Sequence, residues 1–92
     1  MKDLKLEIYT PSGMLYDDGV TSVTLPGAQG KFTVLKNHGA IISSLTEGEI
    51  RYKINEDDED EDVISIEVTG GFVEVKHNVV TVCLDTVIEW EN

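Results

Sequence analysis

The sequence has little cysteine, few basic residues and no long apolar run, and each shortage excludes a class of protein. Cys83 is the single cysteine, so the chain can form no internal disulfide and has no thiolate cluster for zinc. Seven Lys and Arg stand against 18 Asp and Glu, a formal net charge of −11. Binding to nucleic acid is not expected, because phosphate contacts need clustered cations. No apolar run approaches ~18 residues, so direct bilayer insertion is not expected.

Ninety-two residues are enough for one domain. We expect residues 1–92 to form it without an internal linker. Charged residues interrupt the apolar ones over residues 1–7, which is unlike a signal peptide. The acidic run Glu56–Asp62 holds seven of the negative charges, and removing them from −11 leaves −4 for the rest. We interpret residues 55–62 as an acidic hairpin loop.

Apolar and polar residues alternate along most of the chain, which indicates short β-strands. The clearest apolar rows are Leu4/Leu6/Ile8, Ile50/Tyr52/Ile54, Ile64/Ile66/Val68 and Val80/Val82/Leu84. Turn residues separate the rows at short intervals: Pro11 and Gly13, Asp17-Asp18-Gly19 as a tight turn or a bulge, Gly70-Gly71, and Asn78 as the left-handed residue of a hairpin. We predict an all-β fold, a flattened β-sandwich or barrel of about ten short antiparallel strands without a C-terminal helical hairpin.

Three features could carry chemistry, and a structural role is the preferred interpretation of each. The run Glu56–Asp62 offers oxygen ligands to calcium, but it lacks the glycine and the spacing of a calcium loop. His38 and His77 flank loops, and no serine lies in a nucleophile-elbow motif, which favours surface histidines over a catalytic pair. Cys83 lies among apolar neighbours and is interpreted as a buried, inert thiol. No catalytic residue, cofactor or metal site is predicted.

Two segments, residues 32–35 and 40–42, are apolar at both odd and even positions. An antiparallel strand at a protein surface normally shows polar side chains on one face, so the second face needs a cover. A partner chain or a loop of the same chain could supply it, and the residues leave both open. Met14, Leu15 and Tyr16 add side-chain types that suit an interface. The residues therefore predict a small β module with a binding patch.

Four blocks carry more specific information, because they occur together in one order and spacing. They are Leu6–Gly13, Val20–Leu35, Asn37–Arg51 and Gly70–Asp85, the last with a Gly-Gly-hydrophobic-x-Glu-Val segment followed by Asn-x-Val-Thr-Val. In this arrangement the chain resembles the epsilon subunit of bacterial F-type ATP synthases. The resemblance implies a ten-stranded flattened β-sandwich. It also implies a non-catalytic central-stalk subunit that links the gamma subunit to the membrane ring of c subunits and helps couple proton flow to ATP synthesis. Such a subunit is peripheral, at the cytoplasmic face of the bacterial inner membrane.

The resemblance also suggests which residues meet each partner. The loop Gly27, Ala28, Gln29, Gly30 and Lys31 matches the family's contact with the c ring. Contact with gamma is expected at Thr10, His38 and Ser43, and the apolar excess adds Ile41 and Ile42. The alternative is a free-standing β-sandwich that binds a protein or, through its acidic loop, a divalent metal.

Three departures from the family pattern limit this transfer. Relatives commonly carry an acid where Lys31 stands, so a salt bridge to a basic ring loop would be lost here. The loop Lys36-Asn37-His38-Gly39-Ala40 keeps the histidine and lacks two prolines of the family pattern, which predicts a less rigid loop. Many relatives continue into two C-terminal helices that restrain ATP hydrolysis, whereas this sequence ends at Asn92, so that inhibition is not transferred.

Overall fold

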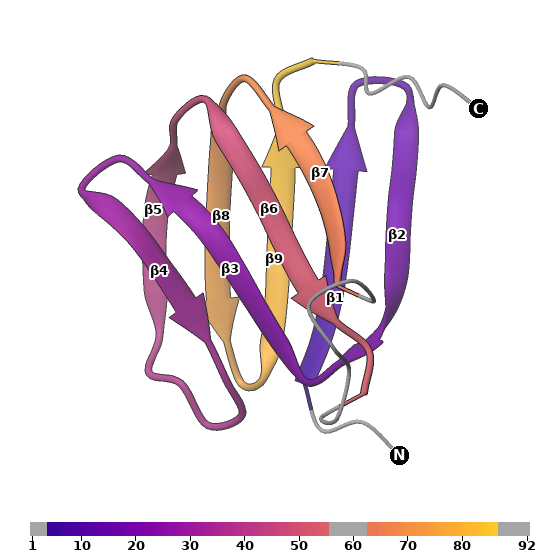
Figure 1. Ribbon diagram of the computed structural model, residues 1–92, viewed down its shortest axis with the longest axis vertical. Helices are drawn as coiled ribbons and strands as arrows, with labels where there is room; N and C mark the ends of the chain where they lie inside the picture. Colours follow the sequence, from indigo (N-terminus) through magenta and orange to yellow (C-terminus); the bar gives the residue numbers. More distant parts are fainter. Residues whose placement is uncertain (1–3, 56–62, 87–92) are drawn as a thin grey trace.

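Nine β-strands make up all the regular structure in residues 4–55 and 63–86, the part of the chain that the computed structural model describes (Figure 1). They are β1 Leu4–Thr10, β2 Gly13–Val20, β3 Ser22–Gly27, β4 Gly30–Val34, β5 Ile41–Leu45, β6 Gly48–Lys53, β7 Ile64–Val68, β8 Gly71–Lys76 and β9 Val79–Leu84. The predicted all-β class is confirmed, with nine strands in these ranges where about ten were expected. Most of the predicted acidic loop, residues 56–62, lies outside the described residues.

The strands form one curled sheet in the order β2-β1-β9-β8-β5-β3-β6-β7, with β4 paired to β3. β3 and β5 pair only between Gly27 and Leu45. At this point the sheet turns from a five-stranded layer, β2-β1-β9-β8-β5, into a four-stranded layer, β4-β3-β6-β7. Figure 1 shows β3 and β6 of the second layer crossing over β8 and β9 of the first. This arrangement is the predicted flattened sandwich.

One strand pair differs from the expected antiparallel arrangement. β1 and β9 run parallel, with Lys5 opposite Val79 and Tyr9 opposite Cys83. The other pairs are antiparallel, including the hairpins that join neighbours in sequence. A tight turn requires an antiparallel pair, but no turn joins β1 to β9, which come from the two ends of the described chain. Strand alternation in the sequence carries no information about such a pair.

The core lies between the two layers, and the predicted apolar rows supply most of it. Leu4, Leu6 and Ile8 of β1 are 2%, 0% and 0% exposed. The buried hydrophobic set also includes Val20, Val23, Leu25, Val34, Leu45, Ile50, Tyr52, Ile66, Val68, Val73, Val75, Val80, Val82 and Leu84. Full burial of one aliphatic side chain stabilises a fold by about 1.5–3 kcal/mol. The alternation of the sequence therefore predicted correctly which side of each row faces inward.

Two turn predictions had different outcomes. Asn78 has a φ of 62° and His77 a φ of 51°, so the β8–β9 hairpin has its left-handed residue where expected and a second one before it. The prediction of a tight turn or a bulge at Asp17-Asp18-Gly19 was wrong, because β2 runs through these residues and they pair in regular register with β1. The irregularity lies instead opposite the Ile8/Tyr9 step of β1.

Aromatic packing closes the sandwich where backbone pairing does not reach. Tyr16 of β2 and Tyr52 of β6 belong to different layers, and their ring centroids are 4.7 Å apart at 46°. Tyr52 is only 4% exposed. Burial raises the pKa of its phenol to about 12, and the neighbouring Tyr16 adds to the rise. The neutral phenol is therefore the form that the folded state favours.

This pKa predicts a loss of stability in alkali. In the unfolded chain the Tyr52 phenol has the ordinary tyrosine pKa of 10.0, whereas in the folded chain its pKa is about 12. The stabilisation is thus complete below pH 10 and lost as pH rises toward 12, a change of about 2–3 kcal/mol in the free energy of unfolding. Denaturant unfolding at a series of pH values measures it. Tyr52→Phe should remove this part of the stability loss in alkali. Tyr9→Phe changes a half-exposed tyrosine and should keep it. Identical profiles of unfolding free energy against pH for both variants would contradict the assignment to Tyr52.

Candidate partner-binding surfaces

The β3–β4 hairpin carries the residues predicted to meet the c ring. Gly27 pairs with Gly30, so Ala28 and Gln29 form the turn, and Gly30 has a φ of 128° that favours glycine. Residues 28–31 are exposed, whereas Gly27 is buried. A Cβ on Gly27 would lie 2.8 Å from the carbonyl oxygen of Gly30. Only glycine fits there, and the hairpin is correspondingly tight.

Two backbone hydrogen bonds fix this hairpin to β5 and the turn that follows it. The Ala28 amide donates to the carbonyl oxygen of Ser44 at 2.9 Å, and the Thr46 amide donates to that of Pro26 at 2.9 Å. They flank the single pairing of β3 with β5. The hairpin tip is therefore a rigid, exposed projection at the point where the two layers join.

Strand β5 presents the predicted gamma-binding residues Ile41, Ile42 and Ser43 on two faces. Ile42 pairs with Glu74 on the side away from the core and is 74% exposed. Ile41 and Ser43 are half-buried and lie on the side of Val75 and Val73, which are buried. Together with residues 28–32 and Ser44, these three line an open hollow of about 550 Å³. The structure thus brings the predicted ring loop and part of the predicted gamma site to one place.

The other two predicted gamma residues lie elsewhere. Thr10 ends β1, where its hydroxyl donates to the carbonyl oxygen of Gly13 at 3.0 Å. The strand order places β1 three positions from β5 in its layer. His38 lies between β4 and β5, at the end of the molecule opposite the β1–β2 turn (Figure 1). A partner that contacts all five predicted residues would have to span the length of β5 and reach across the layer.

Residues 32–35, which are apolar at both odd and even positions, include an exposed side chain. Val34 is fully buried and Phe32 packs partly against the core, whereas Leu35 is 56% exposed. With Ile42, two large apolar side chains of the predicted patches therefore face solvent. The alternative explanation required a loop of the same chain to cover these two side chains, and within the described residues no loop does so.

Both histidines border a second, smaller hollow of about 400 Å³, together with Asn37, Asn78 and Lys76. The two asparagines connect the β4–β5 loop to the β8–β9 turn: the Asn37 amide donates to Asn78 Oδ1 at 2.6 Å, and Asn78 Nδ2 donates to Asn37 Oδ1 at 3.3 Å. These two hydrogen bonds hold the β4–β5 loop in place, although it lacks the two prolines of the family pattern. No carboxylate or hydroxyl lines the hollow, so it contains no nucleophile and acid to form a triad with a histidine.

The chemistry-bearing residues of the described chain do not assemble into a metal or catalytic site. No group of three or more His, Cys, Asp or Glu in the described ranges could hold a metal ion. The candidate calcium run Glu56–Asp62 lies outside those ranges. Cys83 is half-buried, so the prediction of a buried thiol was wrong: its strand position faces away from the core. Residues 4–55 and 63–86 also include no helix long and apolar enough to cross a bilayer.

A known protein family matches almost the whole chain, including both candidate surfaces. The family described as "ATP synthase, Delta/Epsilon chain, beta-sandwich domain" matches residues 3–90. The chain belongs to this family. The match covers both candidate surfaces and the whole described sheet. It confirms the family predicted from the four sequence blocks.

Individual relatives show the same assignment. The chain is 39% identical over 84 residues to the ATP synthase epsilon chain of Latilactobacillus sakei, covering 91% of this chain and 57% of the relative. It is 41% identical over 85 residues to that of Sulfurimonas denitrificans, covering 92% and 62%. The relative from Chlorobium limicola is 36% identical over 77 residues, with 84% of this chain and 83% of the relative covered. The chain thus spans about three fifths of the length of most of these relatives.

Solved structures share the fold at low sequence identity. One chain of the central stalk/c-ring structure of the Tetrahymena thermophila mitochondrial ATP synthase gives a TM-score of 0.74 at 16% identity, covering 91% of this chain and 64% of that one. A chain of the Euglena gracilis mitochondrial enzyme gives 0.79 at 19% identity, covering 91% and 51%. These likenesses concern the fold alone.

We expect the hydrogen bonds between Asn37 and Asn78 to keep the loop that carries His38 in a fixed conformation. Asn78→Gly keeps a residue that tolerates the φ of 62° and removes the acceptor of the Asn37 amide. We expect the Asn37 amide to exchange its proton several-fold faster and the protein to lose about 1 kcal/mol of stability. His77→Gly changes the same turn without removing the acceptor and is the matched control. Equal exchange at Asn37 in both variants would contradict the connection.

Proposed function

We propose that the chain is the part of an ATP synthase central stalk that links the gamma subunit to the c ring and transmits the coupling between proton flow and ATP synthesis. The observation that supports this most directly is the junction of the two layers. There, the exposed β3–β4 hairpin and the outward residue Ile42 belong to one rigid unit, bonded at Ala28–Ser44 and Pro26–Thr46. A part that transmits rotation needs stiffness more than chemistry, and a continuous sheet supplies it.

The proposed division of the surface follows the two sets of predicted residues. The hairpin tip, Gly27–Lys31, faces the c ring, and β5 with the loop before it faces gamma, through Ile41, Ile42, Ser43 and His38. Thr10 marks a further gamma contact at the β1–β2 turn. On this proposal the chain is peripheral at the cytoplasmic face of the bacterial inner membrane, where both partners meet.

The gamma contact predicts a sharp effect at Ile42. Because this side chain is 74% exposed, Ile42→Asp should leave the fold and the melting temperature nearly unchanged. Desolvating a carboxylate in an interface is costly, so the affinity for the cognate gamma subunit should fall at least tenfold. Gel filtration of co-expressed chains, followed by calorimetric titration, measures the loss.

Ser65→Asp is the control, since it adds the same carboxylate at an exposed position of β7, in the other layer and outside the predicted contact residues. It should leave the complex intact. The absence of a complex between wild-type chain and gamma at micromolar concentration would overturn the proposed function itself, because a standard interface of ~1,600 Å² survives gel filtration.

Lys31 tests the ring contact separately. An exposed cation at the hairpin tip fits a ring loop that offers carboxylates or carbonyl oxygens instead of basic residues. Lys31→Glu should therefore weaken the binding of the stalk to cognate c rings by several-fold at low salt, and Lys31→Gln by less. Added salt should reduce the difference. Tighter binding by Lys31→Glu would show that the ring loop is basic and would overturn this part of the proposal.

A further inference from the structure

The hollow beside the β8–β9 turn has a lining of basic and amide side chains. One side of it comes from the loop between β4 and β5 and the other from the β8–β9 turn, which Figure 1 shows at the same end of the sandwich. Its volume is about 400 Å³, and its lining residues are Asn37, His38, Ala40, Lys76, His77 and Asn78. Every side chain of this lining that can carry a charge carries a positive one. The hollow therefore reverses the sign of a chain whose net charge is −11.

Hydrogen bonds between the two sides fix the shape of the hollow. The bonds of the Asn37 amide to Asn78 Oδ1 and of Asn78 Nδ2 to Asn37 Oδ1 join the loop to the turn. The Lys5 amide donates to the carbonyl oxygen of Asn78 at 2.9 Å and joins the turn to β1. A ligand that enters the hollow therefore meets donors that are already positioned, which lowers the entropy cost of binding.

The ring of His38 has a defined arrangement of donor and acceptor. Its Nδ1 lies 2.7 Å from the carbonyl oxygen of Gly39. Because a carbonyl oxygen only accepts, Nδ1 carries the proton of the neutral ring and Nε2 carries the lone pair. Protonation of the ring turns Nε2 into a second donor. His38 can thus donate a further hydrogen bond to a ligand only as the imidazolium cation.

The backbone of the β8–β9 turn adds to the donor character. His77 and Asn78 have φ values of 51° and 62°, two left-handed residues in succession. Successive backbone N–H groups in turns form concavities that bind anions. The Lys76 ammonium contributes three further N–H donors and no acceptor. Side chains and backbone on this side of the hollow therefore favour the same class of ligand.

The charges of the lining favour an anion over a metal ion. Two histidines are the only residues of the lining with metal-binding side chains, and no group of three or more His, Cys, Asp or Glu occurs in residues 4–55 and 63–86. The ammonium of Lys76 would repel a cation held by His38 and His77. The same ammonium attracts an anion, and no carboxylate of the described chain lines the hollow to oppose it.

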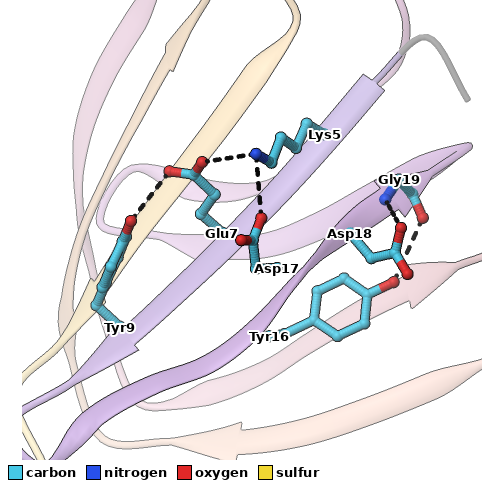
Figure 2. Close-up of polar contacts among 7 residues, drawn as sticks. All are labelled: Lys5, Glu7, Tyr9, Tyr16, Asp17, Asp18 and Gly19. Carbon is cyan, nitrogen blue, oxygen red and sulfur yellow. Dashed lines mark hydrogen bonds and ion pairs between the residues drawn. The ribbon is translucent and has the colours of Figure 1, made fainter.

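Other charged groups lie around the hollow on the elements that form it. Glu74 lies two residues before Lys76 on the same side of β8, about 7 Å away along the strand. Lys36 precedes Asn37 in the β4–β5 loop. Lys5 of β1 lies beside Val79, but its ammonium is paired with Glu7 and Asp17 (Figure 2). The surroundings thus add one carboxylate at a distance and leave the positive sign of the lining unchanged.

We propose that this hollow binds a phosphate group, free or on an ester, through Lys76, His77 and the two asparagines, with His38 as a further donor when protonated. A tetrahedral oxyanion accepts hydrogen bonds in several directions, which suits donors that come from two sides. The hollow is larger than the ~30 Å³ of a water molecule by an order of magnitude, so a phosphate group fits. His38 is also a predicted gamma contact, and the inference does not depend on the proposed function.

The test is a titration of the full chain, without gamma, followed by isotope-edited NMR. Because the donors are exposed, we expect a Kd of about a millimolar for sodium phosphate. The amide signals of residues 36–40 and 76–79 should shift along saturating curves. Sodium chloride at the same ionic strength should not shift them in this way. Equal shifts with both salts, or phosphate shifts centred elsewhere in the chain, would overturn the proposal.

The role of the histidines is tested with sulfate. A phosphate group itself titrates near pH 6, whereas sulfate keeps its charge and is also a tetrahedral oxyanion. Histidine is the side chain whose charge changes between about pH 5 and 8. Sulfate should therefore bind several-fold more tightly near the lower pH than near the higher one, and His77→Asn should reduce this difference. An unchanged pH dependence in His77→Asn would overturn the role of His77.

Glycerol 3-phosphate distinguishes the two sources of a phosphate group. An ester that binds more tightly than inorganic phosphate would assign the hollow to a phosphate ester. Weaker binding of the ester would assign it to the free anion. Both results support the proposal, whereas binding of neither compound would overturn it.

Two lysine variants with the same change of charge test the location of the site. Lys76 and Lys31 are both exposed, and Lys31 lies on the hairpin at the opposite end of β4. Lys76→Gln should weaken phosphate binding about threefold, the size expected for one exposed charge. Lys31→Gln should leave the affinity unchanged, and melting curves check that both variants fold. Equal weakening by the two variants would show that binding depends on net charge alone and would overturn the hollow as its site.

Discussion

The structure depends on the junction where β3 meets β5. A single residue pair, Gly27 with Leu45, joins the five-stranded layer to the four-stranded one. The hydrogen bonds Ala28–Ser44 and Thr46–Pro26 on either side hold it in place. Without this junction the chain would consist of two sheets with one apolar face each and no fixed relation between them. Because it is present, the apolar faces meet as one core, and the β3–β4 hairpin projects from the point of greatest constraint.

The binding surfaces are consequences of the same constraint. Since every described strand gives one face to the core, partners can use only the outer sides of the layers, the hairpin tips and the strand ends. The hairpin tip and β5 are adjacent because the junction lies between them. The outer side of the five-stranded layer, β2-β1-β9-β8-β5, is ordered into rows because strand register aligns every second residue of β1, β8 and β9. Both candidate surfaces are therefore rigid before any partner arrives.

Polar networks on this protein organise the surface and leave the core apolar. No buried polar or charged residue occurs among those described. The asparagine pair connects two loops at one end of the sandwich, and the Lys5–Glu7–Asp17 cluster lies on the solvent side of β1 and β2 (Figure 2). Such a division suits the mechanical part in an ATP synthase that we propose for this chain. On the proposed function, specificity for gamma comes from exposed apolar positions such as Ile42.

The sequence by itself determined the strand-rich class, the inward side of each strand and the family, because alternation at Leu4–Ile8 or Val80–Leu84 reflects burial that any pairing must satisfy. It could not determine which strands pair. The parallel β1–β9 pair, the passage of β2 through Asp17–Gly19 and the outward position of Cys83 follow from contacts between residues far apart in the chain, whose register no local pattern encodes. Hence the hairpin tip and β5 could be predicted as separate segments, while their common hollow could not. Likewise, the hollow lined by Asn37 and Asn78 exists only after two segments 41 residues apart have come together.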